Sequence, residues 1–305
     1  MSFDRLIKKI DSMQNPTVAG LDPKLDFVPD FIKKAAFAEY GKTLEGAAAA
    51  LLVFNKGLID ALCDIVPAVK PQAAYYEMYG WQGVKALCET ISYARSKGMF
   101  VITDGKRNDI GATMEAYAAA HLGKTDVGGT VLEAFDADAL TVNAYLGSDG
   151  IYPLLDVCKK YDRGIFVLVK TSNPSSGELQ DQTLTDGKTV CSHMGEMCEK
   201  WGEVSIGGYG YSCVGAVVGA TYPDQLRVLR AELEHTFFLV PGYGAQGGGA
   251  KDAVAAFDRN GRGAVINSSR AIMCAYLKDG TAPEGYAEAA RREALRMRDD
   301  IKANI

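Results

Sequence analysis

Short apolar runs alternate with longer amphipathic stretches along the whole chain. The runs end in polar residues, which is typical of buried strands in a parallel sheet. We therefore expect strands at 17–22, 68–72, 100–106, 139–145, 164–172, 213–220, 237–242 and 263–269. Between them, the spacing of apolar residues predicts helices at 37–65, 78–96, 113–122, 154–161, 190–201, 223–234 and 250–258, and a last helix from about Pro283.

This alternation predicts an α/β fold. Continuous apolar strands, each followed by a helix, form a parallel sheet that helices cover. Eight such units in 305 residues suggest a single (β/α)8 TIM barrel over residues 1–305, and a doubly wound open sheet is the alternative. Because 37–65 is long for one barrel helix, we expect a break in it. A polar segment at about 173–211 follows the fifth strand, and we expect an insertion there that covers the site.

The composition narrows the classes of function. Residues are 48% hydrophobic and 23% charged, which suits a large buried core. The net charge of −5, without a basic stripe, argues against a nucleic-acid-binding protein. No apolar run approaches membrane-spanning length, and the N-terminus has no apolar signal core, so we expect no membrane partner. The seven cysteines form no C-x-x-C motif, so we expect reduced thiols, no metal site and a cytoplasmic location.

Charged residues gather where the third apolar run ends. Asp104, Lys106 and Asp109 follow a buried strand, where ionised groups are costly unless they are paired. Asp104 and Lys106 are two residues apart, so they point to the same side of an extended chain. A lysine between carboxylates can transfer a proton or stabilise a developing negative charge. In isolation, however, this pattern is more typical of a solvated loop with salt bridges.

Polar residues also follow most of the other predicted strands. In a TIM barrel the chemistry lies at the carboxyl ends of the strands. These ends carry Asp22, Lys70, Asn143, Ser172, Gln246 and Ser269-Arg270. Solvated strand ends could account for some of these residues, but charges of both signs on one rim favour a functional site.

A glycine loop follows the seventh predicted strand. The sequence Gly242-Tyr-Gly-Ala-Gln-Gly247 matches G-x-G-x-x-G, which alone suggests a dinucleotide site. One strand remains downstream and no acidic residue ends it, so a single phosphate held by loop N–H groups is the better interpretation. Arg270, after the eighth strand, would add a bidentate cation at the phosphate site that recurs in TIM barrels. A plain tight turn is the alternative.

Together these residues resemble the orotidine 5′-phosphate decarboxylase family. The resemblance is carried by Gly20-Leu-Asp22, Val69-Lys70-Pro-Gln, Asp104-Gly-Lys106-Arg-Asn-Asp109-Ile-Gly-Ala-Thr113, Pro241-Gly-Tyr-Gly-Ala-Gln246-Gly-Gly and Ser269-Arg270. The D-x-K-x-x-D-[IV]-[GP]-x-T pattern is highly specific for this family when the other segments are also present. The segment Lys170-Thr-Ser172-Asn-Pro, with the long insertion after it, is similar to the larger bacterial branch.

The resemblance implies a role for each matched residue. Lys70, Asp104, Lys106 and Asp109 would form an alternating charge network, with Lys106 as the proton donor and Asp104 beside the substrate carboxylate. Asp22 would bind the ribose hydroxyls and Ser172 the pyrimidine, while Gln246, Gly247 and Arg270 would hold the phosphate. Asp109 and Thr113 would reach the neighbouring subunit's site, which implies a homodimer.

The implied reaction is loss of the carboxylate from C6 of orotidine 5′-phosphate, which gives uridine 5′-phosphate and CO2 in pyrimidine biosynthesis. Lys106 would stabilise the C6 carbanion and protonate it, with no metal or organic cofactor. A magnesium-dependent barrel enzyme that acts on a keto-sugar phosphate would share the charged core, although Ser172, Gln246 and Thr113 fit a nucleotide better. A non-catalytic phosphosugar-binding barrel is the other alternative.

Overall fold

The computed structural model of the chain describes residues 1–244 and 249–305. Within these residues, eight parallel strands close into a barrel in the order β1-β10-β9-β8-β7-β6-β3-β2, which confirms the TIM barrel and excludes the open sheet. The strands are β1 (Thr17–Leu21), β2 (Ala68–Pro71), β3 (Phe100–Arg107), β6 (Ala139–Val142), β7 (Gly164–Lys170), β8 (Val214–Val218), β9 (Phe237–Val240) and β10 (Ala264–Ser268).

Most of the strands end earlier than the sequence suggests. The fourth predicted strand, 139–145, ends at Val142, because Asn143 leaves the sheet and its Oδ1 accepts a hydrogen bond from the Tyr145 backbone N–H (3.0 Å). Such a side-chain-to-backbone bond is a turn device, and it competes with strand pairing. The polar residues that follow the strands therefore belong to rim loops.

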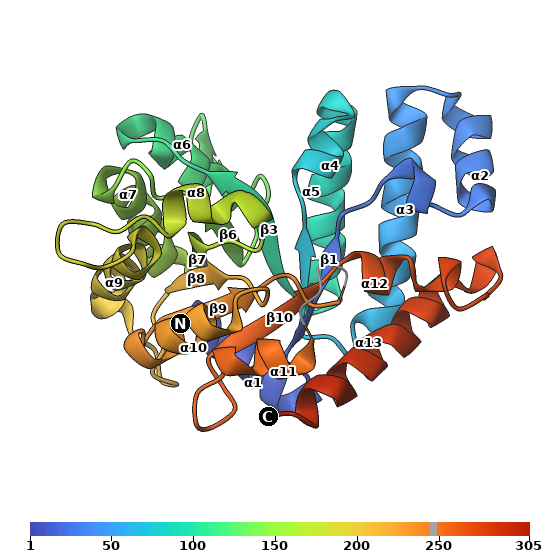
Figure 1. Ribbon diagram of the computed structural model, residues 1–305. Coiled ribbons are helices and arrows are strands. Elements are labelled where there is room, and N and C mark those ends of the chain that lie inside the picture. Colours follow the sequence, from blue (N-terminus) through green and yellow to red (C-terminus); the bar gives the residue numbers. More distant parts are fainter. Residues whose placement is uncertain (245–248) are drawn as a thin grey trace.

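Helices surround the barrel. They are α1 (Ser2–Met13), α2 (Asp30–Tyr40), α3 (Leu44–Leu62), α4 (Ala74–Glu77), α5 (Gly80–Ser96), α6 (Gly111–His121), α7 (Ser148–Tyr161), α8 (Gly177–Gln180), α9 (Val190–Gly202), α10 (Pro223–Glu232), α11 (Ala250–Ala253), α12 (Arg270–Met273) and α13 (Tyr286–Lys302). The paired helices α2 and α3 lie on one side of the barrel, and α9 and α10 lie on the other (Figure 1).

The break expected within 37–65 is present. Helix α2 ends before Gly41, which has a φ of 71°, and Thr43 begins α3 by accepting a hydrogen bond from the Gly46 N–H (3.1 Å). Several elements were not predicted from the sequence: helix α1, the one-turn helices α4, α8 and α12, and the hairpin of β4 (Thr125–Val127) and β5 (Thr130–Leu132). Both hairpin strands are short and all their residues are exposed, so they carry no alternation of buried and exposed positions that a sequence could reveal.

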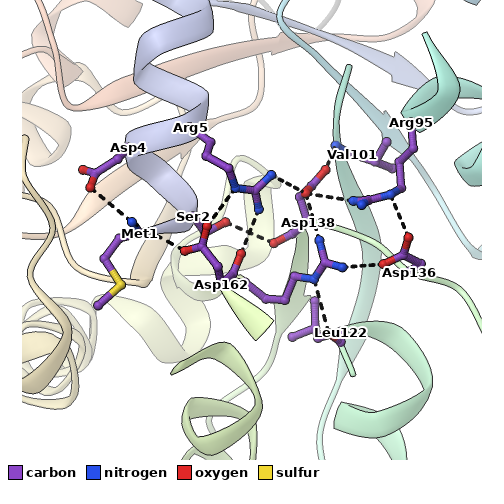
Figure 2. Close-up of polar contacts among 11 residues, drawn as sticks. Met1, Ser2, Asp4, Arg5, Arg95, Val101, Leu122, Asp136, Asp138 and Asp162 are labelled. Atoms are coloured by element: carbon purple, nitrogen blue, oxygen red, sulfur yellow. Dashed lines mark hydrogen bonds and ion pairs between the residues drawn. The ribbon is translucent and has the colours of Figure 1, made fainter. Parts of the chain in front are cut away.

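Helix α1 closes the amino-terminal end of the barrel. Its Phe3 packs between the barrel residues Phe166 and Phe237, with ring centroids 4.8 and 5.3 Å away. Beside it, Asp138 is 2% exposed in its side chain and accepts hydrogen bonds from Arg5 (2.8 Å) and Arg95 (2.9 Å). Figure 2 shows these two arginines reaching Asp138 from opposite sides. This end of the barrel is thus fixed by packing and paired charges.

The barrel interior changes character along its axis. Near the base the inward side chains are apolar, among them Ala68, Ala139 and Val265. Two residues further along the same strands stand Lys70, Thr141 and Asn267. Because side chains alternate along a strand, these polar residues face the interior one layer higher. The site therefore lies at the carboxyl end, above an apolar plug.

The segment 173–211 contains both a flap and a barrel helix. Its first part forms the 3-10 turn Pro174–Ser176 and then α8, and we name residues 174–180 the flap. Helix α9, in the same segment, packs against β7 and β8 and covers the barrel as the helix between them. The part that is additional to the barrel pattern is therefore the stretch before α9.

Candidate active site

A cavity of about 830 Å³ opens at the carboxyl ends of the strands. Its lining includes the predicted site residues Asp22, Lys70, Asp104, Lys106, Ser172 and Arg270. These side chains come from loops and strands spread over the whole sequence, and closure of the barrel brings them to one rim. The flap contributes to the same lining.

Asp104 is the centre of the charge network. Its Oδ2 accepts hydrogen bonds from Lys70 Nζ (2.6 Å) and Gln72 Nε2 (3.0 Å). Its Oδ1 accepts from Lys106 Nζ (2.6 Å) and the Thr141 hydroxyl (2.8 Å). Burial raises the pKa of the Asp104 carboxyl, but the charges of Lys70 and Lys106 outweigh burial and hold this pKa well below its usual range. Asp104 is therefore an ionised group at neutral pH.

The two lysines differ in their access to a ligand. The Lys70 side chain is 6% exposed, whereas that of Lys106 is 46% exposed. Burial lowers the pKa of the Lys70 ammonium, but the carboxylates of Asp104 and Asp22 outweigh burial and hold this pKa above its ordinary value. Lys70 therefore acts as a buried counter-charge, and Lys106 presents its ammonium to the cavity.

Asp22 and Ser172 lie on the cavity wall. Asp22 is half-buried, and its Oδ1 has no hydrogen-bond partner among the described residues. A buried carboxylate oxygen without a protein partner is available to accept hydrogen bonds from a ligand's hydroxyl groups. Ser172 follows β7 and packs against Gly219, where an added Cβ would lie 2.9 Å from the Ser172 Cα. This close approach fixes the backbone that carries the Ser172 hydroxyl.

Arg270 is a further cation on the rim. It begins α12, is exposed and lines the cavity, and its guanidinium makes no hydrogen bond to a described residue. Its guanidinium is thus free to hold an anion with its planar set of donors. Gln246 and Gly247, the other predicted phosphate ligands, lie outside the described residues.

Comparison with known proteins identifies the family. Residues 54–283 match the family described as Orotidine 5′-phosphate decarboxylase / HUMPS. The chain belongs to this family. A relative from Rhodopirellula baltica named Orotidine 5′-phosphate decarboxylase is 44% identical, with 94% of each chain covered. A relative of the same name from Clostridium perfringens is 39% identical and covers 100% of this chain and 99% of its own.

A solved structure of a protein named OMP decarboxylase has a similar fold. The Leishmania donovani OMP decarboxylase matches with a TM-score of 0.72 and 30% identity, and the match covers 98% of both chains. The resemblance carried by the charge motif and the expectation of a decarboxylase are therefore confirmed.

Two motif residues of this family member lie away from the cavity. Asp109 is in the loop after β3, where its Oδ1 accepts a hydrogen bond from the Ile110 N–H (2.8 Å). Thr113 is exposed on α6. Within the described part of this single chain, neither residue lines the cavity or contacts Lys106. The structure thus brings Lys70, Asp104 and Lys106 together and leaves Asp109 outside that group.

Sequence reasoning missed two polar members of the network in this decarboxylase-family chain, Gln72 and Thr141. Their spacing from predicted rim residues could have revealed them. Gln72 lies two residues after Lys70, and Thr141 lies two residues before Asn143. Alternation along a strand places such residues on the same face. Asn143 itself was a rim candidate, but it is exposed and does not appear in the cavity lining.

Neither a metal site nor a membrane span is found in the described part of the chain. In residues 1–244 and 249–305, no group of His, Cys, Asp and Glu side chains could hold a metal ion. No helix in these ranges is both long and apolar enough to cross a membrane.

Proposed function

We propose that the protein converts orotidine 5′-phosphate into uridine 5′-phosphate and CO2, a step of pyrimidine biosynthesis. The observation that carries this proposal is the half-exposed Lys106 ammonium, held 2.6 Å from Asp104 on the cavity wall. Support comes from relatives of nearly equal length that are named for this reaction.

The chemical difficulty is the negative charge left at C6 when the carboxylate departs. That charge lies in the plane of the pyrimidine, so the ring's π system does not delocalise it. A fixed ammonium beside C6 attracts the carbanion more strongly than it attracts the bound substrate, because the negative charge becomes localised at C6 only as the carboxylate departs. Lys106 supplies this ammonium and then protonates C6. Since Asp104 already orients the ammonium, little reorganisation is needed during the reaction.

Asp104 could also repel the substrate carboxylate. Two like charges about 4 Å apart repel by about 4 kcal/mol at an effective permittivity of about 20. In this site, however, Lys70 and Lys106 both neutralise Asp104. The repulsion is therefore smaller than for an isolated pair, and we assign the larger part of catalysis to stabilisation of the carbanion by Lys106.

The remaining residues orient the substrate. Arg270 holds the phosphate together with Gln246 and Gly247, Asp22 accepts hydrogen bonds from the ribose hydroxyls, and Ser172 contacts the pyrimidine. Energy from the phosphate contact would be used at the distant C6 centre, because only a correctly held substrate meets the Lys106 ammonium. Proton transfer and charge stabilisation both come from lysine, so the proposal includes no metal or organic cofactor.

The active form is proposed to be a homodimer in which Asp109 and Thr113 complete the partner's site. Exposed apolar side chains occur beside Asp109 and further along the chain: Ile110, Val127, Val131, Leu132 and Tyr145. Clustered exposed apolar residues commonly mark a protein interface. A twofold dimer that covers them would let each copy contribute the same loop to the other. We also propose a cytoplasmic location, which the unpaired cysteines support.

The reaction is tested by mixing EDTA-treated protein with orotidine 5′-phosphate and following the loss of substrate absorbance. We expect complete conversion to uridine 5′-phosphate with no added metal. Binding of orotidine 5′-phosphate without any conversion would favour a non-catalytic phosphosugar-binding barrel. Activity that requires magnesium and a keto-sugar phosphate would favour the other enzyme class.

A further inference from the structure

The hydroxyl of Thr141 lies between two parts of the charge network. Thr141 is in β6 and is 1% exposed. Its Oγ1 donates a hydrogen bond to Asp104 Oδ1 (2.8 Å) and accepts one from the backbone N–H of Lys106 (3.0 Å). One oxygen atom therefore connects the carboxylate of the network to the main chain of the lysine that faces the cavity.

The backbone of Lys106 has an unusual conformation. Its φ is 48°, in the left-handed region that side chains other than glycine rarely adopt. Such a conformation persists only where the surrounding structure holds it in place. Functional sites are where these conformations are commonly found, because they aim a side chain in a direction that regular structure does not allow.

An irregularity in β3 explains this conformation. Strand β3 pairs with β6 through Thr103 and Leu140, and then again through Arg107 and Val142. Between these two pairs, β3 runs from Thr103 to Arg107, whereas β6 runs only from Leu140 to Val142. Strand β3 therefore has extra residues that bulge out of the ladder. A bulge of this kind interrupts the ladder and leaves backbone groups that need other partners.

Thr141 is the β6 residue opposite this bulge. Its side chain, rather than its backbone, accepts the hydrogen bond from the Lys106 N–H. The hydroxyl thus fixes the Lys106 main chain, from which the lysine side chain extends. At the other end, the Lys106 ammonium is held by Asp104, which Thr141 also contacts. The Lys106 main chain is therefore bonded to the Thr141 oxygen directly, and the Lys106 ammonium is linked to that oxygen through Asp104 Oδ1.

From this geometry we propose that Thr141 is a positioning residue for the reaction, and that its hydroxyl fixes where the Lys106 ammonium meets C6 of the substrate. The inference rests on the proposed decarboxylation. Thr141 acts through Lys106 and Asp104, so its loss impairs the chemical step more than substrate binding. Misplacement of a reacting group by about 1 Å can cost about a hundredfold in rate.

The chain allows matched variants at this position. Thr141→Val keeps the shape and removes the hydroxyl, whereas Thr141→Ser keeps the hydroxyl and removes the methyl group. Thr141→Ala and Thr141→Ser form a second pair that differs by one oxygen atom, and this pair serves if the buried valine variant does not fold. For each protein, kcat and KM for orotidine 5′-phosphate are measured, together with the Kd for uridine 5′-phosphate and the Tm.

We expect kcat to fall about ten- to a hundredfold in Thr141→Val and Thr141→Ala, with KM and the product Kd within about threefold of wild type. Thr141→Ser should retain kcat within about fivefold. A wild-type kcat in either hydroxyl-free variant would overturn the inference and leave the proposed function intact. An equal loss in Thr141→Ser would also overturn it, because packing of the methyl group would then be the cause. Wild-type protein that does not convert the substrate would overturn the proposed function, and this inference with it.

Discussion

At the scale of single residues, burial and ion pairing shift the pKa values of Asp104 and Lys70 in opposite directions, and ion pairing is the stronger effect. Burial alone would make Asp104 a weaker acid, and burial alone would make Lys70 a weaker base. Each group reverses that tendency in the other, since their charged atoms lie 2.6 Å apart. The pair stays ionised inside the barrel, and this keeps the more exposed Lys106 ammonium oriented toward the substrate.

A pH dependence follows from the lowered pKa of Asp104. Its folded-state pKa lies below the unfolded value of about 3.9, so Asp104 stabilises the fold above pH 4, and this contribution is lost as the pH falls through the folded pKa. We expect Asp104→Asn to be less stable than wild type at pH 7, because Lys70 loses its counter-charge. The difference should shrink by about 1 kcal/mol at pH 3. Urea unfolding of both proteins at pH 7, 4 and 3 tests this, and a constant difference would contradict it.

Arg270 can be tested through the substrate's phosphate. We expect Arg270→Ala to lower kcat/KM for orotidine 5′-phosphate about a hundredfold or more, because two charge-assisted hydrogen bonds are lost. With the phosphate-free nucleoside, the same variant should equal wild type. Arg259→Ala is the matched control, since Arg259 is exposed and does not line the cavity. An equal loss on both substrates would show that Arg270 acts elsewhere than at the phosphate.

At the scale of elements, the sequence predicts the strands well and the places where they end poorly. Apolar runs reveal a buried strand, but the Asn143 side chain bonds to the backbone where β6 ends, and the Thr141 hydroxyl bonds to the backbone at the bulge in β3. Both are contacts between side chains and backbone that hydrophobic periodicity does not record. The charged cluster of Asp104 and Lys106 was predicted from the sequence, whereas Gln72 and Thr141, the polar residues that orient it, were missed although strand alternation places them on the same face.

An ion pair joins the end of β7 to the residue after the flap, and two hydrogen bonds between Thr171 and Gln180 hold the flap itself. Lys170, at the end of β7, has a side chain that is 0% exposed, and its Nζ lies 2.8 Å from Asp181 Oδ1. Gln225 of α10 donates to the same oxygen (2.8 Å). Asp181 follows directly after the flap, so this contact fixes the flap against the barrel beside the cavity. Sequence spacing could not predict the contact, because the partners belong to a strand and an irregular segment.

Removal of Asp181 should therefore loosen the flap. We expect Asp181→Ala to lose stability toward the lower end of the roughly 3–5 kcal/mol typical of a broken buried pair, because Asp181 itself is partly exposed. Since the flap lines the cavity, KM should rise more than kcat falls. Asp186→Ala, a change in the same segment at a residue without an ion pair to the described residues, is the control. Unchanged Tm and KM in Asp181→Ala would show that the flap is held in another way.

At the scale of the whole molecule, the two ends of the barrel are organised for different purposes. The base, with Phe3 and Asp138, is closed by packing and fully paired charges. The opposite rim holds Asp22 and Arg270, whose polar groups remain available to a ligand. The fold could be predicted because its alternation repeats along the chain. The role of Asp109 could be inferred only from the family resemblance, because its proposed partner belongs to a second copy.

A shared site predicts complementation between inactive variants. If Asp109 acts in the partner's site, a heterodimer of Lys106→Ala and Asp109→Ala has one doubly altered site and one native site. After subunit exchange in an equal mixture, we expect about one quarter of wild-type activity, because half of the dimers are mixed. A mixture of Lys106→Ala and Asp104→Ala should stay inactive, since both residues serve the same chain's site. No recovery in the first mixture would contradict the shared site.

The most direct test of the whole account is the rate at which Lys106→Ala forms uridine 5′-phosphate and CO2 from orotidine 5′-phosphate, measured beside wild type. Because the variant lacks both the fixed ammonium and the proton donor, we expect kcat to fall at least about a thousandfold, while the Kd for uridine 5′-phosphate changes less than about tenfold. A kcat within about tenfold of wild type would contradict the central role of Lys106.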